Sequence, residues 1–270
     1  MANFGIPKPG IKEKYFGHNV FELLKELKSF YTGMLFNDNT STIAIVENVI
    51  NFNSKIYESI SNTIDSISIL LSKGHISDAA SLMRKYNDAV TLHVLLHILS
   101  DEEQQKMLEE SHTMYDNIVN SWAYGRGLLM KQEDSIIPKL KDKDEELTRI
   151  LFNHFKIYNK GRTIGDDNVH YNTWEAFMIN CHQIMDYELA LRYLDDMNSS
   201  IRLIFSIHFA CLAIFNPMSM IDEEAIQTIS YGQDTEYYVT PFVSDMFSKH
   251  IKAYDFELAH YLEQRTTLHF

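Results

Sequence analysis

Apolar residues recur at the spacing of an α-helix over most of this chain, and little interrupts them. Between residues 43 and 71 they form one stripe of a helix: Ile43, Val46, Ile50, Ile56, Ile60, Ile64, Ile67 and Leu71. Only ten glycines and five prolines occur in 270 residues, so few positions force a helix to stop. The pattern predicts an all-α fold, a bundle of long antiparallel helices.

Start and stop signals divide this pattern into elements. The residues from Asp38 to Thr42 suit a helix start, Gly74 suits a helix end, and Ser100-Asp101 marks the end of the next helix. Gly161 and Gly165 are expected to break a later helix. The predicted helices cover residues 20–36, 43–74, 77–99, 101–129, 139–160, 174–192 and 201–215.

The composition changes after Asn216-Pro217. No lysine or arginine occurs between Arg202 and Lys249, whereas acidic residues are frequent there. We therefore predict two domains, a helical bundle over residues 1–216 and an acidic helical subdomain over residues 217–270 that covers it. The acidic stretch is either a solvated face or a site for a basic partner.

Charge, termini and cysteines exclude several classes of protein. The net charge of −13 argues against a general nucleic-acid coat, which needs clustered lysine and arginine. Residues 1–10 lack the apolar core of a signal peptide, so we expect a cytoplasmic location. The apolar run 203–215 is shorter than the roughly 20 residues that span a bilayer, so no membrane partner is expected. Cys181 and Cys211 are expected to be buried free thiols.

The densest group of chemically useful side chains is the segment 166–172, Asp-Asp-Asn-Val-His-Tyr-Asn. His170 can titrate near neutral pH, and Asn168 or Asn172 could fix its tautomer. Two interpretations stay open. The segment is either a capping cluster at a helix N-terminus or one wall of a cleft in which His170 acts.

Other candidate residues lie on helix faces. Arg84 and Asp88 are four residues apart, so they share a face, and either Arg84 or Arg162 could offer charge to an anion near His170. His93 and His97 have the same spacing, but a zinc site needs at least one further ligand, so packed or solvent-facing histidines are the preferred interpretation. No metal and no cofactor are expected.

A resemblance follows from these residues. Long helices, an arginine in an early helix and the Asn-x-His-x-Asn element at residues 168–172 resemble the HEPN-type helical proteins of bacterial defence and toxin systems. Members with nuclease activity carry an arginine followed after four to six residues by histidine, usually with a polar residue directly after the arginine. They cleave RNA without metal. Arg149–His154 and Arg202–His208 keep that spacing but have an apolar residue after the arginine, and seven residues separate Arg162 from His170.

The resemblance implies a metal-independent ribonuclease or toxin-type effector. His170 would then be the general acid or base, and Arg84 or Arg162 would steady the scissile phosphate; Asp88, Asn168 and Asn172 are the accompanying binding residues. Two alternatives stay open, a non-catalytic interaction or regulatory module for a basic protein partner, and a small-ligand-binding bundle or hydrolase that uses the histidines. The expected partner is RNA or a protein, and a homo-oligomer is compatible with both.

Overall fold

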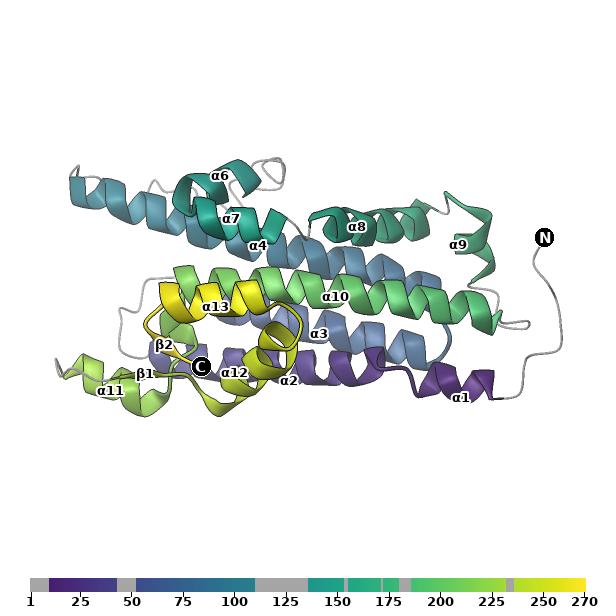
Figure 1. Ribbon diagram of the computed structural model, residues 1–270, viewed down its shortest axis with the longest axis horizontal. Helices are drawn as coiled ribbons and strands as arrows, with labels where there is room; N and C mark the ends of the chain where they lie inside the picture. The colour runs from purple at the N-terminus through teal and green to yellow at the C-terminus, as the bar shows by residue number, and fades with distance from the viewer. Residues whose placement is uncertain are drawn as a thin grey trace. The chain divides into compact units, whose positions relative to one another are not determined.

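The protein was analysed as a computed structural model. It describes residues 10–42, 52–109, 136–152, 155–170, 172–179, 186–231 and 236–270. Helix dominates these residues (Figure 1), and the predicted all-α fold class is confirmed.

The long helices are α2 (Val20–Thr42), α3 (Phe52–Ser72), α4 (Ile76–Glu109) and α10 (Tyr187–Phe215). The shorter ones are α1 (Ile11–Phe16), α6 (Ile136–Lys143), α7 (Glu145–Phe152), α8 (Phe155–His170), α9 (Trp174–Met178), α11 (Glu223–Ser230), α12 (Pro241–Met246) and α13 (Phe256–Arg265). A 3₁₀ turn, η4 (Pro217–Ser219), follows α10, and a π-helix, η5 (Phe247–Lys252), follows α12. The strands β1 (Tyr237–Tyr238) and β2 (Leu268–His269) pair in parallel, Tyr237 with Leu268.

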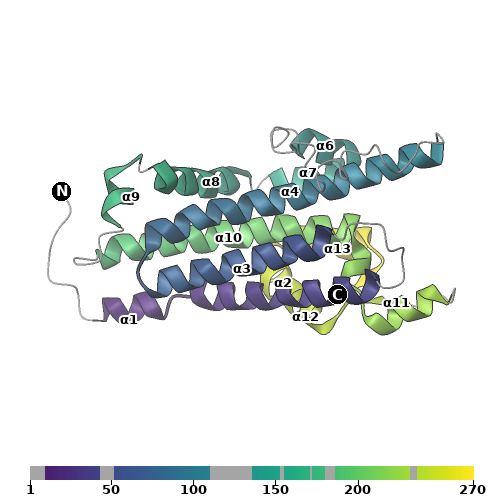
Figure 2. The same ribbon diagram turned by 180° about the vertical axis from the view of Figure 1, so that it is seen from behind.

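Residue contacts divide the chain into two compact units. The first holds residues 1–29, 59–88 and 154–205, and the second holds residues 30–58, 89–153 and 206–270. Helices α2, α3, α4 and α10 each contribute residues to both units; Figure 2 allows their course to be followed from behind. The boundary predicted at residue 216 stays a prediction.

Several predicted helix bounds are wrong: α10 runs unbroken across the predicted gap between residues 192 and 201, and the predicted helix 139–160 is divided among α6, α7 and α8. Residues 38–42 close α2 instead of starting a helix, and α4 continues through Ser100-Asp101 to Glu109. Capping residues are tolerated inside a helix when packing favours its continuation. Helix α8 also runs through both Gly161 and Gly165. Residues 43–51 and 110–135, to which parts of two predicted helices were assigned, lie outside the described residues.

Gly165 allows close packing instead of ending a helix. A Cβ atom built at Gly165 would lie 2.8 Å from Cβ and 3.4 Å from Cα of Arg84, and 3.5 Å from the carbonyl oxygen of Ala80. Helices α8 and α4 of the first unit therefore approach so closely at this point that only glycine fits without a shift. This contact decides which side chains of α4 lie beside α8.

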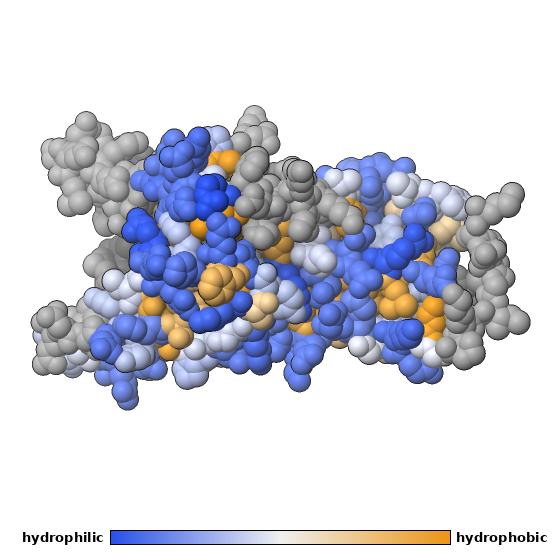
Figure 3. Space-filling view, in the orientation of Figure 1, coloured by the Kyte–Doolittle hydropathy of each residue, from blue (hydrophilic) through white to orange (hydrophobic). Residues whose placement is uncertain are grey.

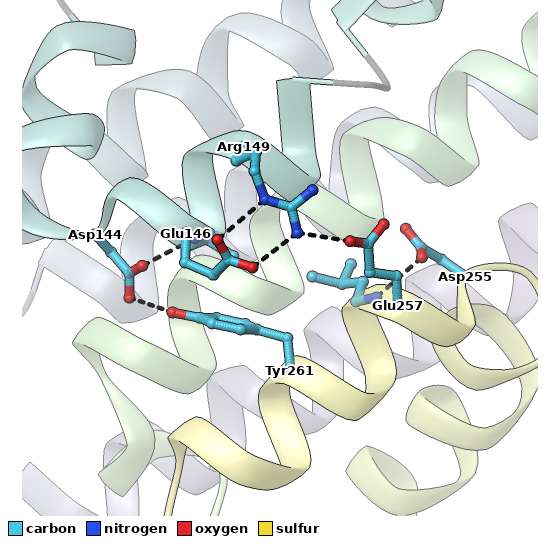
Figure 4. Close-up of polar contacts among 8 residues, drawn as sticks. Asp144, Glu146, Arg149, Asp255, Glu257 and Tyr261 are labelled. Carbon is cyan, nitrogen blue, oxygen red and sulfur yellow. Dashed lines mark hydrogen bonds and ion pairs between the residues drawn. The ribbon is translucent and has the colours of Figure 1, made fainter.

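In the second unit, α7 and α13 are joined by polar contacts (Figure 4). Asp144 caps α7 by accepting a hydrogen bond from the Leu147 amide at 2.9 Å, and its other oxygen accepts one from the Tyr261 hydroxyl at 2.6 Å. Arg149 bridges Glu146 and Glu257, each at 2.7 Å. Asp144 is buried, so its capping and bridging bonds compensate for its desolvation.

Helix α10 supplies much of the core. Residues 203–213 are buried almost throughout, as predicted for a core helix. Within the described part of the chain, α10 is the one helix long and apolar enough to cross a bilayer, and 61% of its most apolar window is buried in the protein.

The free thiol of Cys211 lies in this helix. Its burial and the nearby Asp144 carboxylate raise the pKa of the thiol, which makes it a poor nucleophile. Cys181 lies outside the described residues.

Candidate functional site

Arg84 anchors the candidate site in the first unit. Its Nε donates to both carboxylate oxygens of Asp88 on the same helix, at 2.8 and 3.0 Å. Its Nη1 donates to Asp166 of α8 at 2.6 Å. The Arg84 side chain is 19% exposed, so these charge-assisted bonds form in a partly desolvated setting, where they are stronger than on open surface. Arg84 and Asp88, which were predicted to share a helix face, form an ion pair, and Asp166 joins it.

The polar segment 166–170 forms the last turn of α8, not the N-terminal turn of a helix. The prediction of an N-terminal cap is wrong because α8 passes through the glycines before it. Asp166 and His170 are four residues apart in α8 and so share a face. His170 is exposed and lies one helical turn beyond the carboxylate that binds Arg84.

The two asparagines have different surroundings. Asn168 is 3% exposed, and its Nδ2 donates to the carbonyl of Ile164 at 2.8 Å. Asn172 is exposed, and both its backbone amide and its Nδ2 donate to Asp167, at 3.0 and 3.2 Å. Asn172 therefore closes the end of α8 beside His170, whereas Asn168 packs inside.

Arg162 lies in α8, four residues before Asp166 and eight before His170. This spacing gives Arg162, Asp166 and His170 positions on one face of the helix. The side chain of Arg162 and all of Tyr171 lie outside what the structure describes.

An aromatic pair next to this segment was not predicted as part of a site. Trp174 and Phe177 of α9 are 71% and 49% exposed. Their rings stack with centroids 5.5 Å apart and planes 26° from parallel. In the sequence, the two aromatics are three residues apart, which indicates a shared helix face. Such a pair more often packs in the hydrophobic core than forms part of a site.

Helix α9 is fixed at its start by Thr173, whose hydroxyl accepts a hydrogen bond from the Ala176 amide at 3.1 Å. The half-buried Tyr193 of α10 lies beside the same turn. Its pKa is raised by burial and then by the charges of Glu175 and Asp167; hydrogen bonding with Asn168 and the charge of Arg192 act in the opposite direction. Carboxylates from α8 and α9 thus converge around Tyr193.

The second unit holds a separate polar network of histidines. The Tyr31 hydroxyl lies 2.8 Å from Nδ1 of His208, and Nε2 of His208 lies 2.9 Å from Nδ1 of His93. Nε2 of His93 lies 2.9 Å from Oδ1 of Asn53 and 3.1 Å from Nε2 of His97. Tyr31, His93 and His208 are fully buried.

With Oδ1 of Asn53 turned towards His93, these contacts allow one proton arrangement for neutral rings, in which Nε2 of His97 carries no proton because it faces the protonated Nε2 of His93. Oδ1 of Asn53 can only accept, so Nε2 of His93 carries a proton and its Nδ1 accepts one from Nε2 of His208. Nδ1 of His208 then accepts from the Tyr31 hydroxyl. Every donor in this series of hydrogen bonds, from Tyr31 to Asn53, has an acceptor. This is the condition for a stable buried polar network.

Burial keeps the network uncharged. Burial, followed by the charges of His97 and His208, lowers the pKa of His93 well below its ordinary value. Burial likewise lowers the pKa of His97 to about 4 and that of His208, with a contribution from His97, to about 3.

No cluster of three or more histidine, cysteine or acidic side chains among the described residues has the geometry of a metal site. His93 faces His208 and His97 through different nitrogens, so one ion cannot bridge all three in this arrangement. The network is therefore a core element of the second unit.

Comparisons with known proteins give no relative to guide the assignment. No protein-family model matches the chain, and neither a curated protein nor a solved structure is significantly similar to it.

Proposed function

We propose that the protein is a HEPN-like, metal-independent ribonuclease or toxin-type defence effector, with His170 as its general acid and base. One contact carries the proposal: Nη1 of Arg84 in α4 lies 2.6 Å from Asp166 in α8, across 82 positions of sequence. Because Asp166 and His170 share a face of α8, the contact supports a site that contains both Arg84 and His170. An exposed histidine beside a fixed arginine suits the cleavage of a phosphodiester.

The chemistry needs only side chains of this face. His170 takes the proton of the ribose 2′-hydroxyl as its oxygen attacks the adjacent phosphorus. The protonated ring then returns a proton to the 5′-oxygen that leaves, which gives a 2′,3′-cyclic phosphate and a 5′-hydroxyl. Positive charge offsets the charge that develops on the phosphate oxygens. It comes from Arg84 of α4 and from Arg162, whose position in α8 is on the helix face of His170.

The carboxylates of Asp88 and Asp166 limit how Arg84 can take part in this reaction. Arg84 already pairs with Asp88 and Asp166, so its first role is to hold the last turn of α8 against α4 and so position His170. It reaches a phosphate only by exchanging one carboxylate for a phosphate oxygen. Arg84 is therefore first a positioning residue, and it offers its charge to a phosphate only after such an exchange.

The proposal is tested in a host that expresses the wild type, His170→Ala and Arg84→Ala at matched soluble levels. We expect growth arrest and cleaved total RNA with the wild type, and loss of both effects with each variant. His260→Ala is the matched control because His260 is another exposed histidine, in α13 of the second unit; it should act like the wild type. Intact RNA and normal growth with the wild type would reject the nuclease.

The acidity of the chain gives a second test. A protein of net charge −13 repels RNA, and salt screens that repulsion over about 10 Å at 0.1 M. We expect RNA cleavage by the purified wild type to rise severalfold as ionic strength increases from about 20 to about 200 mM. A fall in rate with salt would show that a basic surface recruits the RNA, and it would contradict the site on α8.

A further inference from the structure

The face formed by the end of α8 and by α9 exposes apolar rings. Val169 is 48% exposed and lies next to His170. Trp174 and Phe177 are exposed as a stacked pair. An isolated exposed apolar residue is ordinary, but a stacked aromatic pair with an apolar neighbour marks a surface that gains free energy when it is covered. On the face seen in Figure 3, hydrophilic residues cover most of the described surface and hydrophobic ones occur in small groups.

Charge around this face is strongly acidic. Residues 162–202 contain three arginines, Arg162, Arg192 and Arg202, and no lysine, against seven acids: Asp166, Asp167, Glu175, Asp186, Glu188, Asp195 and Asp196. Asp166 is paired with Arg84, and Asp195 bonds to His18 at 3.0 Å. Asp167 and Glu175 both act on the Tyr193 hydroxyl, with Arg192 as the opposing charge. Two carboxylates, Asp167 and Glu175, and one cation, Arg192, therefore act on the same hydroxyl beside α9.

Rings combined with carboxylates select a cation. An arginine or lysine over an indole face is attracted by the ring, and nearby carboxylates can bind the same group. A nucleobase also stacks on aromatic rings, but Asp167 and Glu175 oppose the phosphates attached to it and favour a cation, so a basic segment bound at Val169 would compete with RNA at the adjacent His170. Anionic membrane lipids would be repelled for the same reason.

We propose that Trp174, Phe177, Val169, Asp167 and Glu175 form a docking face for a basic segment of a partner protein. An arginine or lysine of the partner lies over the Trp174–Phe177 pair and its apolar residues cover Val169. This inference goes beyond the proposed nuclease and does not depend on it. The sequence also left the acidic residues 217–270 open as a site for a basic partner, but several acids there already pair within the chain, Asp245 with Lys249, Glu263 with Lys252 and Glu257 with Arg149.

The chain offers a reporter at the proposed face. It contains two tryptophans, Trp122 and Trp174, so Trp122→Phe leaves Trp174 as the only indole. Full-length Trp122→Phe is titrated with a short peptide of alternating arginine and leucine, with the same peptide carrying glutamate for arginine, and with an oligouridine. We expect a saturable change of Trp174 fluorescence with the arginine peptide alone. Calorimetry on the wild type gives the same affinity without relying on the Trp122 substitution.

Two variants in this background test the face itself. Phe177→Ala and Glu175→Gln should each weaken binding of the arginine peptide by about tenfold. Glu224→Gln makes the same charge change at an exposed site in the second unit and should leave the affinity unchanged. Equal weakening by Glu224→Gln would show mere attraction to an acidic protein, and saturation by the oligouridine would show a nucleobase platform. Either result, or the absence of any saturable binding, overturns the proposal.

Discussion

The free energy of unfolding is expected to fall as the pH is lowered from about 6.5 to about 5, because of the histidines of the second unit. His93, His97 and His208 stay neutral in the folded protein, since burial lowers their pKa. In the unfolded chain each regains an ordinary pKa near 6.5. Below that value the unfolded state binds more protons than the folded state, so acid favours unfolding.

The size of this effect follows from linkage. The stabilisation is fully present above pH 6.5, and it is lost as the pH falls towards the folded-state values, about 4 for His97 and about 3 for His208. Each such histidine contributes a slope of up to about 1.4 kcal/mol per pH unit inside this window. Three together can therefore remove a large part of the stability of an ordinary domain.

Urea denaturation at pH 7.5, 6.5, 5.5 and 5.0 (all about 0.1 M salt) measures the slope. His97→Gln should reduce it by up to about 1.4 kcal/mol per pH unit, because one titrating group is removed at the end of the network. His260→Gln should leave it unchanged, since His260 is exposed. A wild type whose stability does not change from pH 7.5 to 5.0 would contradict the buried, neutral network.

Gly165→Ala is expected to destabilise the protein by about 1–3 kcal/mol, the usual cost of overpacking. Its new Cβ would meet Cβ and Cα of Arg84 and the carbonyl oxygen of Ala80. The first two of these atoms lie next to or in the backbone and cannot rotate away, so α8 and α4 have to separate. Helix propensity acts in the opposite direction, since alanine is favoured over glycine inside a helix by up to about 1 kcal/mol.

Gly33→Ala is the matched comparison, because Gly33 also lies inside a helix, α2. There the new Cβ would meet the ring of Phe242 at 2.9 Å, a side chain that can turn aside, so we expect a smaller loss than at Gly165. Chemical denaturation of both variants gives the two values. A Gly165→Ala variant more stable than the wild type would show that the two helices are not in close contact.

The sequence predicts the fold class well because long apolar stripes with few glycines leave helix as the only way to bury them. It predicts helix ends poorly. Local preferences alone predict that Gly165 ends a helix, but close packing against Arg84 requires a glycine inside α8. The helix start predicted at residues 38–42 is wrong because α2 continues through these residues to Thr42.

Site residues follow the same division between local and distant information. The pairing of Arg84 with Asp88 follows from a spacing of four residues. Its second partner, Asp166, comes from another helix and has no local signal. His93 and His97 were recognised as a pair by spacing, whereas the packing of the second unit brings in His208 and Tyr31.

The most direct test of the proposed nuclease is cleavage of single-stranded RNA by purified protein in excess EDTA, with His170→Ala and His260→Ala assayed beside the wild type. The account predicts cleavage that persists in EDTA and yields 2′,3′-cyclic phosphate ends. It also predicts a loss of about 10²-fold or more in His170→Ala, the usual contribution of a general acid or base, and none in His260→Ala. No cleavage by the wild type, or equal cleavage by His170→Ala, would contradict it.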